Sequence, residues 1–313
     1  FVRIDENMCK AFKYAVILIS VMYSLNSIIY YFIYSFEGVG HDKIRYHVES
    51  QRYGFILLLG FWLIIFEKTE TRFWFIIKIL SIFIVLNGLG LTFSRSSIVG
   101  LLVSSGSLFI IYLLRFNVNE LKELPYKNIK NILFYLLIGI IIIALSYVLI
   151  PDYYYYFVAK IFRISITPLH QPIFFPYASY PFYQTVFYHF YETSGGYRIF
   201  MIIEIFKFLS NYPLFGSGFL GVWIMFENLS AASHNQLLDV FFRTGIIGFS
   251  AFLYLLYRIL KYNFCYKNLA TFIALMGILA IGMFHETFKL SQGAFLFSFL
   301  AAQAFNQSKI NKK

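Results

Sequence analysis

Three short groups of polar residues interrupt a largely apolar chain, and their side chains are of the types that bind anions and move protons. They are the stretch Thr92–Ser97, which contains Arg95, and the pairs Tyr197–Arg198 and His234–Asn235. A guanidinium binds phosphate-like anions through two parallel hydrogen bonds. A histidine that is neutral near pH 7 can accept a proton. These residue types therefore predict acid–base chemistry beside a bound anion.

Each group also has a simpler structural interpretation. Arg95 can extend toward lipid headgroups, as single arginines at the ends of spans usually do. Arg198 can be a surface arginine at a helix start, although the helix dipole disfavours a cation there. Ser233 or Asn235 can be the N-cap of the helix that follows. Residue types alone leave these alternatives open.

Neighbouring residues favour anion binding. Ser96 and Ser97 can cap the first turn of the next helix, where free N–H groups attract an anion, and Ser94 adds a third hydroxyl. Gly195–Gly196 precede Arg198 and would let the backbone approach a ligand closely. We therefore expect Arg95 and Arg198 to bind the anion.

Charged residues also occur near or inside apolar segments. Asp239 and Arg243 lie four residues apart, so we expect them to form a structural pair on one helical face. His285–Glu286 and Lys289 are expected to form another structural ion pair. The histidines of the outer loops lack metal-ligand spacing, and no nucleotide-binding glycine loop occurs. We expect neither a metal nor a cofactor.

The elements that carry these residues are predicted to be membrane-spanning helices. The 313 residues are 59% hydrophobic and 13% charged, whereas soluble domains are about one quarter charged. Apolar runs recur at about 20 residues, the length that crosses ~30 Å of hydrocarbon. The chain is thus an all-α polytopic membrane protein with about eight spans. They are expected near 11–34, 52–66, 73–91, 96–115, 131–150, 235–260, 267–284 and 286–305.

The distribution of Lys and Arg predicts the orientation of these spans. The segments 1–14, 67–72, 115–130 and 258–267 and the tail from 306 are denser in Lys and Arg than the other connections. They are therefore expected in the cytoplasm, and they account for the net charge of +11 without nucleic acid. All three polar groups then belong to the extracytoplasmic face.

This topology divides the chain into three expected domains. Residues 1–150 hold the first five spans, 151–234 form a large extracytoplasmic cap, and 235–313 hold three closing spans and a cytoplasmic tail. Within the cap, helical spacing from Arg198 to Leu209 predicts an amphipathic surface helix. Its apolar stripe is Ile199, Ile202, Ile203, Phe206 and Leu209.

Three stretches make the chain resemble the O-antigen ligases and the related Wzy-type envelope polysaccharide polymerases. Thr92–Ser97 is similar to the family's Ser-Arg segment at an outer helix end. Tyr197–Arg198 with Asn211–Gly218 is similar to its arginine helix and Pro-Leu-x-Gly-x-Gly turn. His234–Asn235 through Gly245–Gly248 is similar to its His-Asn…Gly-Ile-Ile-Gly signature. The resemblance covers about residues 70 to 260 and departs from the family at Arg243, where relatives often have an acid.

The resemblance implies a GT-C-like enzyme of the bacterial inner membrane. It would transfer a glycan from a polyprenyl diphosphate-linked oligosaccharide to an acceptor glycan or lipid, with inversion and without a metal. His234 would be the base, and Arg198 and Arg95 would stabilise the diphosphate. The substrate-binding residues would be Ser94, Ser96, Tyr197 and Asn235. Relatives tend to have more spans before the Ser-Arg segment, so further N-terminal helices are expected.

Three functions remain open at this level. A polymerase, which we favour, would add the growing chain to a new lipid-linked repeat. An O-antigen ligase would instead transfer the finished glycan to lipid A–core or to a protein. A lipid-linked oligosaccharide transporter is the alternative from another class, but transporters tend to place ionisable residues near the middle of the membrane. Each of these functions involves membrane lipids and no nucleic acid.

Overall fold

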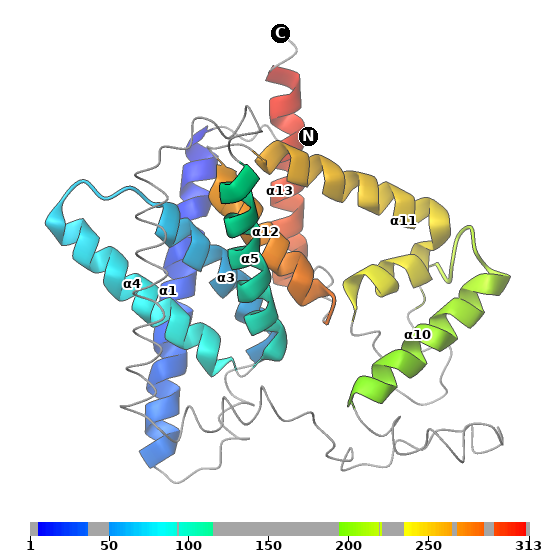
Figure 1. Ribbon diagram of the computed structural model, residues 1–313, viewed down its shortest axis with the longest axis horizontal. Helices are drawn as coiled ribbons and strands as arrows, with labels where there is room; N and C mark the ends of the chain where they lie inside the picture. Colours follow the sequence, from blue (N-terminus) through cyan, green and yellow to red (C-terminus); the bar gives the residue numbers. More distant parts are fainter. Residues whose placement is uncertain are drawn as a thin grey trace. The chain divides into compact units, whose positions relative to one another are not determined.

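The computed structural model describes residues 6–36, 50–92, 94–114, 194–218, 220, 235–264, 268–284 and 291–310. Within these ranges all regular structure is helical (Figure 1). The helices are α1 (Glu6–Phe36), α3 (Ser50–Phe66), α4 (Arg72–Leu91), α5 (Arg95–Leu114), α10 (Ser194–Asn211), α11 (Gln236–Asn263), α12 (Leu269–Gly282) and α13 (Ser291–Ile310). The expected span at 131–150, most of the expected cap, and the group at 285–289 lie outside the described residues.

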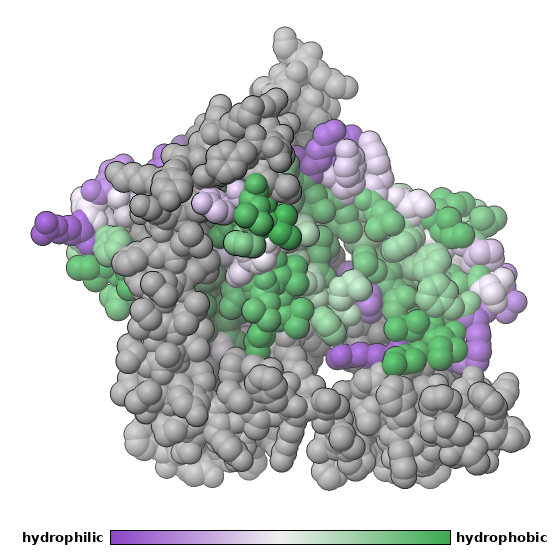
Figure 2. Space-filling model, in the orientation of Figure 1, coloured by the Kyte–Doolittle hydropathy of each residue, from purple (hydrophilic) through white to green (hydrophobic). Residues whose placement is uncertain are grey.

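Several helices have the length and composition of membrane spans. Among the described residues, four helices are long and apolar enough to cross a membrane, and they contain Asn7–Tyr31, Arg72–Leu91, Ser96–Leu113 and Gln236–Asn263. Shorter apolar helices cover Tyr53–Phe66, Leu269–Gly282 and Gly293–Ala302. The described residues on the visible face are mostly apolar (Figure 2). Such a surface suits contact with lipid, which supports a multi-pass membrane protein.

The chain forms two compact units. The first unit comprises residues 1–157, 255–282 and 287–313, and the second comprises residues 158–254 and 283–286. The first unit contains α1, α3, α4, α5, α12 and α13, and the second contains α10 and most of α11.

Small residues let the helices of the first unit approach one another closely. α12 packs against α5 and α3, and α1 packs against α3 and α4. Gly60 of α3 faces the side chain of Ser20 on α1, and Gly100 of α5 faces the backbone of Gly277 on α12. A Cβ at Gly60 or Gly100 would overlap these neighbours. The first unit therefore has the small-residue interfaces that are typical of membrane helices.

Lys78 is a buried cation within the apolar helix α4, and its side chain is only 7% exposed. Its Nζ donates to the carbonyl oxygens of Ile65 and Glu67, each at 2.7 Å, at the end of α3. The Glu67 carboxylate forms an ion pair with Lys13 of α1. Because the carbonyls at a helix C-terminus favour a nearby cation, Lys78 ties α4 to the end of α3.

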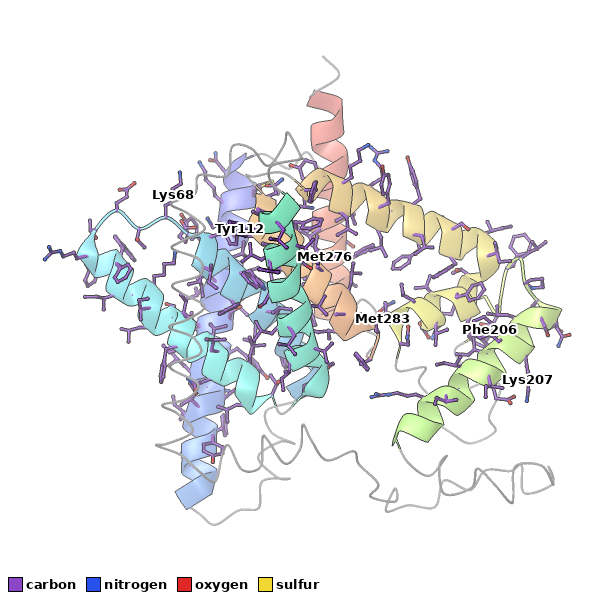
Figure 3. All side chains as sticks on the ribbon, in the orientation of Figure 1. Lys68, Tyr112, Phe206, Lys207, Met276 and Met283 are labelled. Atoms are coloured by element: carbon purple, nitrogen blue, oxygen red, sulfur yellow. The ribbon has the colours of Figure 1, made fainter. Side chains whose placement is uncertain are left out.

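In the second unit, aromatic rings join α10 to α11. The ring centroids of Phe208 and Phe242 are 4.8 Å apart. Those of Phe206 and Phe241 are 6.0 Å apart, and Phe206 is labelled in Figure 3. Phe242 is fully buried by these contacts and by the turn that follows α10. The two helices therefore share one apolar interface.

The buried face of α10 differs from the expected stripe. Among the side chains of α10 that the structure describes, the buried ones are Met201, Ile205 and Leu209, of which the stripe included only Leu209. The residues Ile199, Ile203 and Phe206 are exposed. α10 is apolar around most of its circumference, and Glu204 and Lys207 pair with each other at 2.7 Å. The hydropathy pattern of α10 therefore does not identify the side of this helix that packs on α11.

Candidate active site

The helix α11 is not the continuous span that was expected for residues 235–260. It is broken at Gly245, whose φ of 59° and ψ of −164° lie outside the helical region. Figure 1 shows α11 changing direction sharply along its length. The break separates a short segment, 236–244, from a long segment, 246–263.

The turn that follows α10 occupies this break. Three hydrogen bonds connect them: from the Ser217 N–H to the Phe242 carbonyl at 2.8 Å, from the Ile246 N–H to the Pro213 carbonyl at 2.8 Å, and from the Ile247 N–H to the Leu214 carbonyl at 3.3 Å. In an unbroken helix the Ile246 N–H would donate to the Phe242 carbonyl. Here both groups are bonded to the turn instead. We call residues 213–218 and 242–247 the glycine lock.

Two glycines make the lock possible. Gly216 has a φ of 63°, and Gly245 has a φ of 59°, a region that is costly for other residues. A Cβ at Gly216 would overlap the Phe242 carbonyl oxygen, and a Cβ at Gly245 would overlap the backbone of Leu214. The Pro-Leu-x-Gly-x-Gly turn and the Gly-Ile-Ile-Gly sequence are therefore two halves of one structure.

Asn235 holds the other end of the short segment. Its Oδ1 accepts hydrogen bonds from the N–H groups of Leu237 at 3.0 Å and Leu238 at 3.1 Å, which is an N-cap. Its Nδ2 donates to the Met283 carbonyl at 3.1 Å. One amide therefore caps α11 and ties its N-terminus to the residue after α12.

Arg198 lies in the second turn of α10, because that helix begins at Ser194. The helix thus begins earlier than the expected start at Arg198, and Gly195 and Gly196 lie in its first turn. The helix forms there despite the low helix propensity of glycine. The Arg198 side chain is half-buried, and its Cζ lies 5.7 Å from the centroid of the Phe284 ring, within the range of a cation–π contact.

Asp239 and Arg243 form an ion pair on the short segment. The Arg243 Nε donates to the Asp239 Oδ2 at 2.9 Å, and the Asp239 side chain is only 5% exposed. Asp239 is in the first turn of α11, and Arg243 comes just before the break. This order suits a helix dipole, which favours an anion near the N-terminus and a cation near the C-terminus. The pair therefore stabilises the short segment.

The serines beside Arg95 belong to the first unit. α5 begins at Arg95, so Ser94 precedes the helix, while Ser96 and Ser97 lie in its first turn rather than before it. The Oγ atoms of Ser94 and Ser96 are 2.7 Å apart and both residues are buried. The Ser94 carbonyl accepts from the Ser97 N–H at 3.1 Å. These contacts order the start of α5.

The second unit brings two of the predicted site residues to one short segment. Arg198 contacts Phe284, and Asn235 contacts Met283, which is labelled in Figure 3. Ser94 and Ser96 belong to the first unit, and their meeting with this group remains a prediction. His234 and the side chains of Arg95 and Tyr197 lie outside the described residues.

Sequence reasoning did not single out Met283 and Phe284. The only signal was their position at the end of an apolar span, directly before His285–Glu286. Among the described residues, no three His, Cys, Asp or Glu side chains are grouped so as to hold a metal ion. His234 lies outside the described residues. Metal-independent chemistry at this site remains a prediction.

A comparison of the sequence with models of protein families gives one match, and it covers most of this region. The model of the O-antigen ligase family matches residues 80–253, which include the Ser-Arg segment, α10, the glycine lock and Asn235. The chain belongs to the O-antigen ligase family. Comparisons with curated proteins and with solved structures found no match. The family match ends within α11, so Met283 and Phe284 lie beyond it.

Proposed function

We propose that this O-antigen ligase family member is an envelope polysaccharide polymerase. It takes a glycan from a polyprenyl diphosphate-linked donor and joins it to a sugar hydroxyl of a second lipid-linked repeat. The reaction occurs on the extracytoplasmic face of the bacterial inner membrane. Residues 151–234 form the cap over the growing chain, and about eight spans hold the lipids.

His234 is the base in this proposal. It removes the proton from the acceptor hydroxyl as that oxygen attacks the anomeric carbon of the donor sugar. The bond from that carbon to the diphosphate oxygen breaks, and the configuration inverts. Arg198 and Arg95 stabilise the negative charge that develops on the leaving diphosphate, so the step needs no metal. Ser94, Ser96 and Tyr197 contact the substrate.

The observation that carries this proposal is the segment Met283–Phe284. It contacts both Arg198 and Asn235, and Asn235 directly follows His234 in the chain. Residues 283–284 therefore contact both Arg198, the candidate anion-binding residue, and Asn235, which is next to the candidate base. Family membership supports a glycosyltransferase of the ligase or polymerase type.

The test is a transfer assay on the purified protein with a polyprenyl diphosphate-linked oligosaccharide. The expected product is a longer lipid-linked chain. His234→Ala should lower kcat by about 100- to 10,000-fold, because a general base is lost, with an unchanged melting temperature. His189→Ala, in the expected cap, is the matched control and should retain activity. Normal product from His234→Ala would exclude His234 as the base.

The family description favours one alternative, an O-antigen ligase. In the same assay a ligase would give no longer lipid-linked chains, but would transfer the glycan when lipid A–core or an acceptor protein is added. A lipid-linked oligosaccharide transporter would move the donor across vesicles without any covalent change. The three outcomes separate the three functions.

A further inference from the structure

We propose that the glycine lock carries a membrane-contact surface, which inserts among the acyl chains of one leaflet. The surface comprises Leu214 and Phe215 of the turn and Ile246 and Ile247 of α11, and we call it the apolar collar. Each of these four side chains is at least half exposed. Phe215, at 71%, has the largest exposed fraction among the large hydrophobic side chains that the structure describes. The inference does not depend on the reaction proposed above.

The two segments of α11 differ in polarity. The short segment, 236–244, contains the ion pair of Asp239 and Arg243. The long segment has no charged side chain from Ile246 to Tyr257. Charged side chains are costly within the hydrocarbon of a membrane. The hydrocarbon boundary is therefore expected at the break, between Arg243 and Ile246.

The length of the long segment agrees with this boundary. A helix over 246–263 is about 27 Å long at 1.5 Å per residue, close to the ~30 Å of a hydrocarbon core. Arg258 and Lys261 lie toward its far end, where long cationic side chains reach the headgroups. Ile246 and Ile247 therefore lie just inside the opposite edge of the hydrocarbon.

Main-chain hydrogen bonds hold the turn at the same depth. The Ile246 N–H donates to the Pro213 carbonyl at 2.8 Å, and the Ile247 N–H donates to the Leu214 carbonyl at 3.3 Å. These bonds leave no room for a layer of water between the turn and α11. Leu214 and Phe215 are therefore carried to the same edge of the hydrocarbon as the two isoleucines.

The main chain of the turn is suited to an apolar medium. Main-chain polar groups at membrane depth need partners within the protein. The carbonyls of Pro213 and Leu214 have such partners in α11, and the Gly216 N–H donates to the Tyr212 carbonyl at 3.1 Å. Pro213 itself has no N–H. Because exposed apolar side chains are also more stable among acyl chains than in water, bilayer lipid is the partner of the collar.

The experiment uses the full chain in phospholipid vesicles, with photoreactive benzoylphenylalanine in place of Phe215. Irradiation should join this position to phospholipid acyl chains, and mass spectrometry would identify the product. A fluorescent amino acid at Phe215 should lose more fluorescence to spin labels near the glycerol end of the acyl chains than to labels near their methyl end. The matched control is the same pair of substitutions at Glu70, an exposed residue between α3 and α4. Aqueous iodide should quench the control position instead.

The outcomes identify what covers the collar. Crosslinks to lipid, together with stronger quenching by the shallow spin label, support the inference. Crosslinks only to a second copy or to other residues of the same chain would overturn it. Iodide quenching at Phe215 as strong as at Glu70 would also overturn it, since the collar would then face water. If the variants at Phe215 fail to fold, Ile247 carries the same test, and no outcome depends on transfer activity.

Discussion

The two compact units join their helices in different ways. In the first unit, continuous helices approach through small residues, as where Ser20 faces Gly60. In the second unit, a broken helix is joined to a turn by main-chain hydrogen bonds across Gly245. Side-chain contacts of the first kind bring two surfaces together. The main-chain hydrogen bonds of the second unit also fix the directions of the two segments of α11.

In both units a side-chain nitrogen also donates to a carbonyl at the C-terminal end of a helix or directly after it. Lys78 donates to Ile65, in the last turn of α3, and to Glu67, directly after it. Asn235 donates to Met283 after α12. Broken backbone is tolerated in membranes when its polar groups have partners within the protein. We therefore expect such contacts to contribute to stability in the first unit, and to orient the residues of the candidate site in the second.

The largest effect is expected from Gly245→Ala, which would disrupt the glycine lock of the second unit. The substitution adds strain at a positive φ and an overlap with the backbone of Leu214. It should destabilise the protein by about 3 kcal/mol or more and abolish transfer. Gly218→Ala is the matched control, because its φ is 68° but no neighbour lies near its Cβ. Thermal unfolding in detergent would measure the stability of both variants. Equal losses of stability would argue against the glycine lock.

A smaller effect is expected from Lys78→Met in the first unit. Methionine keeps the apolar length of the side chain, but the carbonyls of Ile65 and Glu67 lose their donor. The melting temperature should fall, with a stability loss of about 1–3 kcal/mol. The turnover number of the remaining folded protein should not change. Lys68→Met, at an exposed lysine, should leave stability unaltered. A selective loss of turnover in Lys78→Met would contradict the division of roles between the units.

The smallest effect is expected at Asn235, where two variants separate the cap from the tie to Met283. Asn235→Asp keeps the oxygen that accepts from Leu237 and Leu238, but it loses the donor to Met283. Asn235→Ala loses both and should cost about 1–2 kcal/mol. If the hydrogen bond to Met283 positions His234, the fall in kcat of Asn235→Asp, expressed as a free energy, should exceed its loss of stability. Wild-type kcat in Asn235→Asp would leave Asn235 with the role of a cap alone.

The described helices lie where the sequence predicts helices, because apolar runs of span length are a local signal. It also predicts the contact between Asp239 and Arg243, since their spacing on one helix is local too. The break at Gly245 is different: its partner is a turn that precedes α11 by a long connection, and one glycine in an apolar run does not reveal it. The contact of Phe284 with Arg198 is similarly non-local. The roles in catalysis and substrate binding of His234, Arg198, Arg95, Tyr197, Asn235 and the two serines remain predictions.

The glycine lock has a consequence for how this chain can change in length. Its bonds pair the main chain of 213–218 with that of 242–247, so an insertion or deletion within either stretch would put donors opposite donors. The start of α11 is fixed separately, by the N-cap of Asn235. Changes of chain length that preserve this fold should therefore fall outside the stretches 213–218 and 242–247.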